Sequence, residues 1–168
     1  KINIFVVFPT IREDLPELIA LIKKSGNLSA LFTNGINISR IGYLKTLKQS
    51  GLNEVHLQFD GFNEKTDLKF RNINLLENRL SALENTRILD IPVVFEVTID
   101  EATNTQEISS ILKYAFNDWH IRGICFRSYC ALGRRGVEIK KLTIDDLVAA
   151  VETNSTGAIN AKDILVLQ

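Results

Sequence analysis

The chain alternates short runs rich in β-branched and aromatic residues with longer segments of helical hydrophobic period, and this alternation strongly limits its fold. The runs predicted as strands are Ile2 to Phe8, Leu28 to Thr33, Glu54 to Phe59, Pro92 to Thr98 and Ile121 to Phe126. The segments predicted as helices are Asp14 to Lys24, Ile38 to Gln49, Leu68 to Leu89 and Thr105 to Phe116. Units of this size suit right-handed βαβ crossovers, so we expect an α/β fold with a mostly parallel sheet.

The pattern changes after the fifth predicted strand. A loop with glycine and arginine follows, and Thr143 then begins a final helix with Asp146 as its capping partner. The length of 168 residues suits one folding unit with a continuous core. We expect a βα core over residues 1–130, with about five βα units, and a C-terminal loop and helix over residues 131–168 packed on that core.

Two of the predicted strands are polar on one face. A parallel sheet that is covered by helices on both faces is apolar on both faces. Here every second residue is polar, which indicates that one face is not covered. The polar residues are His56, Gln58 and Asp60 in one strand and Glu96, Thr98 and Asp100 in the other. We therefore predict a partial parallel β/α barrel whose concave face surrounds a ligand or a water-filled channel.

Polar residues also gather where the predicted strands end. Binding residues of parallel β/α folds lie at the C-terminal ends of the strands, so these positions predict a small-molecule site. They are Pro9-Thr10, Thr33-Asn34-Gly35, Gln58-Phe59-Asp60-Gly61, Thr98 and Arg127-Ser128. The alternative is ordinary turn chemistry, because Asn-Gly and Asp-Gly are common turn formers.

Composition argues against several other classes of protein. The 20 basic and 20 acidic residues cancel and form no basic tract, which argues against binding to nucleic acid. No apolar run reaches the roughly 18 residues needed to span a membrane, so a cytoplasmic protein is expected. The two cysteines, Cys125 and Cys130, are too few for a disulfide scaffold.

Several short motifs occur in an order that resembles the radical S-adenosylmethionine (SAM) superfamily. These are Pro9-Thr10, Thr33-Asn34-Gly35, Gln58-Phe59-Asp60-Gly61, Asn104, Gly133-Arg134 and the tail from Leu142 to Asp163. The tail is similar to one branch of the family, which contains archaeal tetraether lipid synthases and pterin-modifying methyltransferase-like proteins.

The resemblance implies SAM and a four-iron four-sulfur cluster held by a CxxxCxxC loop, with radical chemistry leading to alkylation or carbon–carbon bond formation. On the SAM side it implies Thr33, Asn34, Gln58, Asp60 and Thr98. On the substrate side it implies Glu96, Arg127 and Arg134. It assigns no catalytic residue and no metal ligand within this chain.

The chain also departs from the family pattern. It contains no CxxxCxxC loop, and Val6-Val7-Phe8 stand where the family has a Gly-Gly-Glu triplet that holds the SAM ammonium. We therefore expect a fragment without the first barrel strand and cluster loop, inactive by itself. Two alternatives remain open: a degenerate barrel that serves as a binding domain, and a non-radical enzyme that uses Glu96 and Asp60 as an acid and base pair.

Three further residues carry individual expectations. Cys125 lies in an apolar run and is expected to be a small buried hydrophobic residue. His120 precedes a strand and is expected at the surface. For His56 we expect a hydrogen-bonded core position, with contact to substrate as the alternative.

We predict that the isolated chain dimerises or aggregates through the strand at residues 2–8. This apolar run lies at an edge of the predicted sheet and offers unpaired backbone groups to a second chain. Light scattering at high protein concentration measures this, and a stable monomer contradicts it.

Overall fold

The computed structural model describes residues 1–4, 9–129 and 142–166. The strands are β1 (Ile2–Ile4), β2 (Ser29–Thr33), β3 (Glu54–Gln58), β4 (Val93–Ile99) and β5 (Ile121–Ser128). The α-helices are α1 (Leu15–Lys24), α2 (Ile41–Ser50), α3 (Glu64–Arg71), α4 (Leu76–Ile88), α5 (Ile108–Phe116) and α6 (Ile144–Asn154). Short 3-10 helices occur at Pro9–Ile11, Thr105–Glu107 and Ala161–Asp163.

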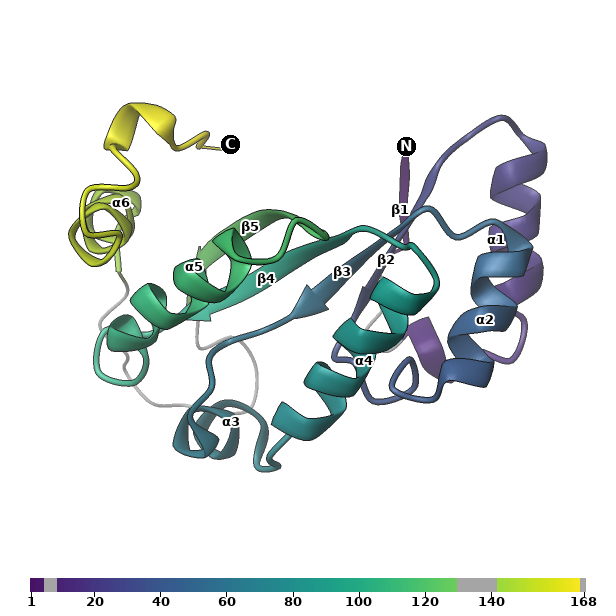
Figure 1. Ribbon diagram of the computed structural model, residues 1–168, viewed down its shortest axis with the longest axis horizontal. Helices are drawn as coiled ribbons and strands as arrows, with labels where there is room; N and C mark the ends of the chain where they lie inside the picture. The colour runs from purple at the N-terminus through teal and green to yellow at the C-terminus, as the bar shows by residue number, and fades with distance from the viewer. Residues whose placement is uncertain (5–8, 130–141, 167–168) are drawn as a thin grey trace.

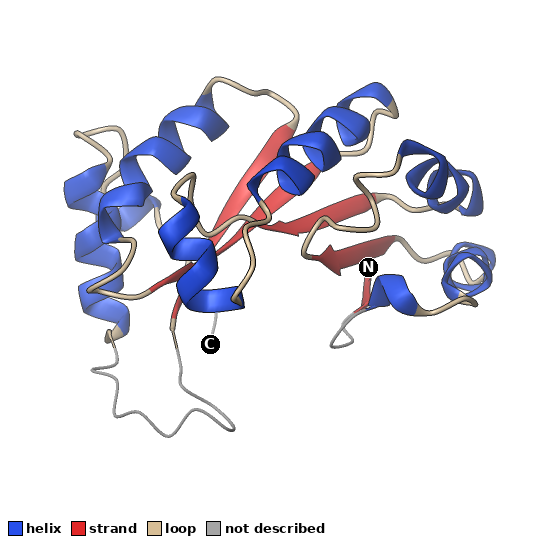
Figure 2. Ribbon diagram, turned by 90° about the horizontal axis from the view of Figure 1, so that it is seen from below, coloured by secondary structure: helices blue, strands red, loops and turns tan. Residues whose placement is uncertain are grey.

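The described strands form one parallel sheet in chain order, from β1 at one edge to β5 at the other. Helix α6 lies beyond the β5 edge (Figure 1). Helices pack along the sheet from one edge to the other (Figure 2). This architecture confirms the predicted partial parallel β/α barrel with about five βα units and a C-terminal helix.

Among the described residues, helices cover one face of the sheet and leave the other face open. In β3 and β4 every second residue is fully buried, and the residues between them are partly exposed. The buried set contains Val55, Leu57, Val93, Phe95, Val97 and Ile99, which pack against apolar residues of α1, α2, α4 and α5. The open face is the polar face that the period of two predicts.

The prediction of a single helix over residues 68–89 is wrong, because α3 ends and α4 begins within this segment. Asn72 ends α3 in the left-handed conformation, with φ of 59°. Asp67 then accepts a hydrogen bond from the Leu75 N–H at 2.8 Å, which fixes the turn before α4. Asparagine tolerates this conformation better than most residues. The hydrophobic period continues across the turn and therefore did not reveal it.

The expected surface position of His120 is also wrong, since its exposed fraction is only 3%. Its backbone oxygen accepts from the Val93 N–H at 3.1 Å, and its ring Nε2 contacts the Ile91 oxygen. A residue that begins an edge strand is buried here because the preceding turn lies against the start of β4.

The predicted start of the last helix is confirmed. The Thr143 hydroxyl accepts from the Asp146 N–H at 3.1 Å, and the Asp146 carboxylate accepts from the Thr143 N–H at 3.0 Å. Within the part of the chain that the structure describes, no helix is both long enough and apolar enough to cross a membrane.

Candidate functional site

The sheet register brings side chains of four strands together on the open face. Each row contains residues that lie opposite one another on neighbouring strands. Toward the C-terminal ends, the rows are Phe32, His56 and Val94, then Gln58, Glu96 and Cys125, then Thr98 and Arg127. The open face therefore carries amide, carboxylate, thiol, hydroxyl and guanidinium groups.

His56 lies between two carboxylates. Its Nδ1 is 2.6 Å from Oε1 of Glu96, and its Nε2 is 2.7 Å from Oε1 of Glu54. The imidazole stacks on the Phe32 ring with 4.1 Å between ring centroids. These contacts agree with the expected hydrogen-bonded histidine, but His56 is only partly buried and lies on the open face of the sheet, not in the core.

Glu54 also contacts Lys1, so a line of charged groups begins at β1. Burial opposes ionisation of Glu54, but Lys1 and His56 outweigh burial and hold the pKa of Glu54 below its ordinary value. The carboxylate is therefore the stable form beside His56.

Glu96 connects His56 to Arg127. Its Oε2 is 2.7 Å from an Nη atom of Arg127, while its Oε1 faces His56. The side chain of Glu96 is 13% exposed and that of Arg127 is 51% exposed. Burial lowers the pKa of Arg127, but Cys125 and Glu96 outweigh burial and raise it. The two atoms are close but poorly aligned for a hydrogen bond, so attraction between the charges holds one side of a guanidinium that is otherwise open to solvent.

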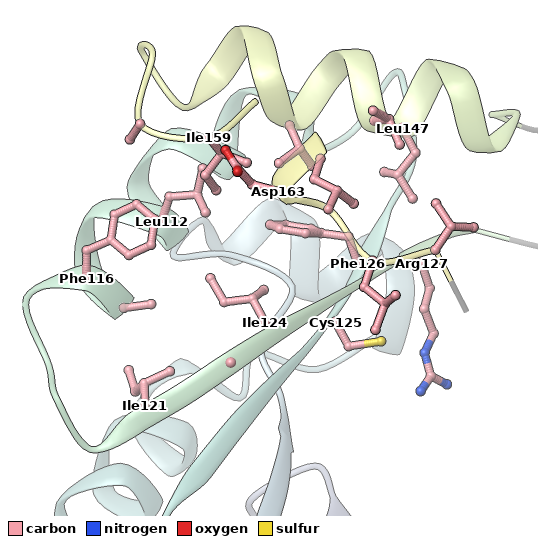
Figure 3. Close-up of a pocket in the computed structure, with 18 of the residues that line it drawn as sticks. Leu112, Phe116, Ile121, Ile124, Cys125, Phe126, Arg127, Leu147, Ile159 and Asp163 are labelled. Atoms are coloured by element: carbon pink, nitrogen blue, oxygen red, sulfur yellow. The ribbon is translucent and has the colours of Figure 1, made fainter. Parts of the chain in front are cut away.

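The prediction that Cys125 is a small buried hydrophobic residue is wrong. Cys125 is only partly buried, and its thiol points to the same side of β5 as Arg127, away from α6 (Figure 3). The flanking residues Ile124 and Phe126 are the ones that face the helices. The apolar neighbours in sequence hid the fact that Cys125 shares its face with Arg127.

Thr33 and Asn34, predicted on the SAM side, shape the turn after β2. The Thr33 hydroxyl accepts from the Gly35 N–H at 3.2 Å, and Asn34 Oδ1 accepts from the Ile36 N–H at 3.1 Å. These are the turn contacts that the alternative interpretation expects. Contact with a ligand stays a prediction for both residues.

Asp60, Gln58 and Thr98 meet at the end of β3. Asp60 is fully buried, and its carboxylate accepts from the Thr98 N–H at 2.8 Å and from Arg71 at 3.1 Å. The Gln58 amide, with its oxygen toward Arg71, accepts from Arg71 Nε at 3.2 Å. Burial raises the pKa of Asp60, while Arg71 and the Thr98 N–H favour its ionised form.

Glu96 and Asp60, the predicted acid and base pair, have separate partners and are not paired with each other. Asp60 pairs with Arg71 and the backbone of Thr98, whereas Glu96 pairs with His56 and Arg127. Both oxygens of Asp60 are occupied by protein groups, so its role at this rim is to position Arg71 and β4.

Two buried polar residues hold the loops of the rim. Asn104 donates to the backbone oxygens of Asp60 and Thr98, both at 2.8 Å. The Glu107 carboxylate accepts from the N–H groups of Phe62 and Asn63 at 2.9 and 3.0 Å, just before α3. Asn104 thus pairs two backbone carbonyl oxygens, and Glu107 pairs two backbone N–H groups at the start of α3.

A separate apolar cavity of about 1260 Å³ lies between β5, α5, α6 and the residues that follow α6. Figure 3 shows its walls from these elements. Its labelled apolar residues are Leu112, Phe116, Ile121, Ile124, Phe126, Leu147 and Ile159. It lies on the helix-covered side of β5, whereas Arg127 and Cys125 point to the open side.

Three predicted features lie outside the described residues. They are the substrate-side candidate Arg134, the second cysteine Cys130 and the altered triplet Val6-Val7-Phe8.

Comparison with known proteins decides the family. Residues 1–115 match the radical SAM superfamily. The chain belongs to that superfamily.

The radical SAM relatives include the 7,8-dihydro-6-hydroxymethylpterin dimethyltransferase of Methanocaldococcus jannaschii, 39% identical over 92% of this chain and 32% of its own length. The Fe-coproporphyrin III synthase of Methanosarcina barkeri is 32% identical over 86% of this chain and 36% of its own length. The chain therefore spans about a third of the length of these curated relatives.

A solved domain of a pyruvate-formate lyase-activating enzyme from Bacteroides vulgatus has the same fold. The TM-score is 0.74 at 10% sequence identity, and the match covers 95% of each chain. The predicted family is confirmed, whereas a relationship to tetraether lipid synthases stays a prediction.

Of the two cofactors of the family, the residues of this chain suit SAM but not the iron–sulfur cluster. The described residues include no group of three or more His, Cys, Asp or Glu side chains that could hold a metal, and the whole sequence has only two cysteines. The residues present do not fit a cluster that needs three thiolates. The open face does fit SAM in its chemistry, because the Gln58 amide and the Thr98 hydroxyl offer groups that suit its amino-acid and ribose parts.

Proposed function

We propose that this chain forms the cofactor- and substrate-facing part of a radical SAM enzyme that alkylates a heterocyclic substrate of the reduced-pterin type. The observation that carries this proposal is the 39% identity to a pterin dimethyltransferase over 92% of the chain. The open polar face supports it, because a small molecule can reach this face without displacing a helix.

The residues divide between the two sides of the site as follows. On the SAM side, Gln58 and Thr98 offer side chains, Thr33 and Asn34 shape the adjoining turn, and Asp60 fixes Arg71 and β4. On the substrate side lie Glu96 and Arg127. SAM bound there supplies the alkyl group or the radical precursor, and the residues of this chain bind and orient it.

The first test uses the natural protein that contains this chain, purified without oxygen. We expect about four irons per protein chain with the visible spectrum of an iron–sulfur cluster. On reduction, SAM should be cleaved, and 7,8-dihydro-6-hydroxymethylpterin should gain a methyl group, as mass spectrometry can show. A reaction without reductant is the control.

An iron-free protein after reconstitution contradicts this proposal. It supports instead the degenerate barrel, in which the open face binds a ligand without radical chemistry. Iron and SAM cleavage without methylation of the pterin leave the reaction class in place and reject the substrate class.

A further inference from the structure

We propose that His56 is a positioning residue, which fixes Glu96 and through it the guanidinium of Arg127 for an acidic group of the bound ligand. This inference rests on the proposed function, because it assigns a task to residues of the same site. His56 itself does not touch the ligand in this proposal.

The contacts form one continuous line across the open face. Lys1 contacts Glu54, Glu54 contacts His56 at 2.7 Å, and His56 contacts Glu96 at 2.6 Å. Glu96 then contacts Arg127 at 2.7 Å. The line runs from Lys1, just before β1, and Glu54, the first residue of β3, to Arg127 near the C-terminal end of β5.

The side chains become more exposed to solvent from His56 and Glu96 to Arg127, as a positioning role for His56 requires. The side chains of His56 and Glu96 are each 13% exposed, whereas that of Arg127 is 51% exposed. The two inner groups are thus shielded from solvent and support each other. The outer group can meet a ligand while one of its nitrogens stays on Glu96.

The stacking of His56 on Phe32 restricts the imidazole further. A ring that is stacked at 4.1 Å and contacted at both nitrogens has little freedom to rotate. A carboxylate that faces this ring through Oε1 presents Oε2 in a defined place. Arginine has a planar fork of donors, so fixing one side of the guanidinium directs the other donors as well.

The ligand group that this arrangement suits is a carboxylate or a phosphate. A guanidinium binds either one through two parallel hydrogen bonds. The acidic group can belong to the methionine part of SAM or to the substrate. Both sources share the same chemistry, and affinity measurements with matched ligands distinguish them.

The test is a double-mutant cycle in the natural protein with its cluster reconstituted. Arg127→Ala is expected to weaken binding of the acid-bearing ligand by roughly a hundredfold, since it removes charge-assisted hydrogen bonds. His56→Phe keeps the stacked ring but removes both nitrogens, and should weaken binding by roughly tenfold. In the Arg127→Ala protein, His56→Phe should have no further effect, because His56 acts through Arg127.

Two more variants complete the cycle. His56→Gln keeps one N–H that can reach Glu96 and should restore part of the affinity that His56→Phe loses. Arg122→Ala removes another arginine of β5, one that lies over the Trp119 ring at 5.6 Å, and should leave binding unchanged.

The ligands are SAM against decarboxylated SAM, and the phosphate ester of 6-hydroxymethyl-7,8-dihydropterin against the unesterified pterin. A loss confined to SAM assigns the acidic group to SAM, and a loss confined to the ester assigns it to the substrate. Equal effects of His56→Phe with and without Arg127 overturn the proposal, as do unchanged affinities for both acid-bearing ligands.

A measurement on the natural protein without added ligand separates this proposal from the proposed function. Nitrogen-15 NMR should show restricted rotation of the Arg127 guanidinium, whose Nη atom lies against Glu96, and this rotation should become faster in His56→Phe and slow again in part in His56→Gln. The signal of Arg122 should not change. If Arg127 gave the same signal in all these proteins, His56 would have no positioning role, whatever reaction the protein catalyses.

Discussion

Replacing Arg79 with methionine is expected to lower the free energy of unfolding by about 3 to 5 kcal/mol. Arg79 of α4 is fully buried, and its Nη1 lies 2.6 Å from Oδ1 of Asp67 in α3. The two atoms are close but poorly aligned for a hydrogen bond, so the attraction between the charges holds the pair. Methionine leaves the Asp67 carboxylate buried without a counter-charge. Chemical denaturation monitored by circular dichroism measures the loss.

Two further variants test the cause of this loss. Asp67→Asn combined with Arg79→Met removes both charges and keeps an oxygen for the Leu75 N–H, so it should recover most of the stability. Arg87→Met removes an exposed arginine of the same helix, which pairs with Glu84 and Asp118, and should cost at most about 1 kcal/mol. A similar loss for Arg79→Met and Arg87→Met would contradict the explanation by a buried charge.

The sequence was sufficient to predict the sheet and its polar face, because both depend on local periodicity. A helix that follows each short strand leaves few arrangements other than a parallel sheet. The period of two in β3 and β4 separates Val55 and Leu57 from His56 and Gln58, and the structure buries the first pair. Hydrophobic burial therefore explains why this part of the prediction succeeded.

The partners of the polar residues could not be predicted, because they depend on register between strands that are distant in sequence. Glu96 meets His56 across 40 residues and Glu107 reaches Phe62 across 45. Glu54 carried one usable signal, its position two residues before His56 on the same face of the strand. Nothing in the sequence around Glu107 marks the backbone N–H groups that it binds.

The position of Asp60 shows that the period of two does not predict which way a side chain points once the strand has ended. Counting by two from His56 and Gln58 places Asp60 on the open face, but β3 ends at Gln58. Beyond that point the chain turns, and the carboxylate is buried against Arg71 and Thr98. Groups within the strands face the ligand side, whereas groups just beyond them hold the loops. If a ligand binds the open face, this division makes Glu96 and Arg127 better placed to contact it than Asp60.

Substituting alanine for Gly61 is expected to lower the free energy of unfolding by about 3 kcal/mol, through backbone strain and a lost cap together. Gly61 has φ of +148°, and an added Cβ would lie 2.6 Å from the Glu107 carboxylate carbon. To make room, Glu107 would have to leave the N–H groups of Phe62 and Asn63.

Gly26→Ala is the control, since Gly26 has φ of +77° with nothing within 4 Å of the added atom, and should cost only about 1 kcal/mol. In a Glu107→Ala protein the cost at Gly61 should fall to that of the backbone strain alone, because the clash and the lost cap both involve that carboxylate. Equal losses for both glycines in denaturation experiments would show that the Glu107 carboxylate moves aside freely and does not hold this turn.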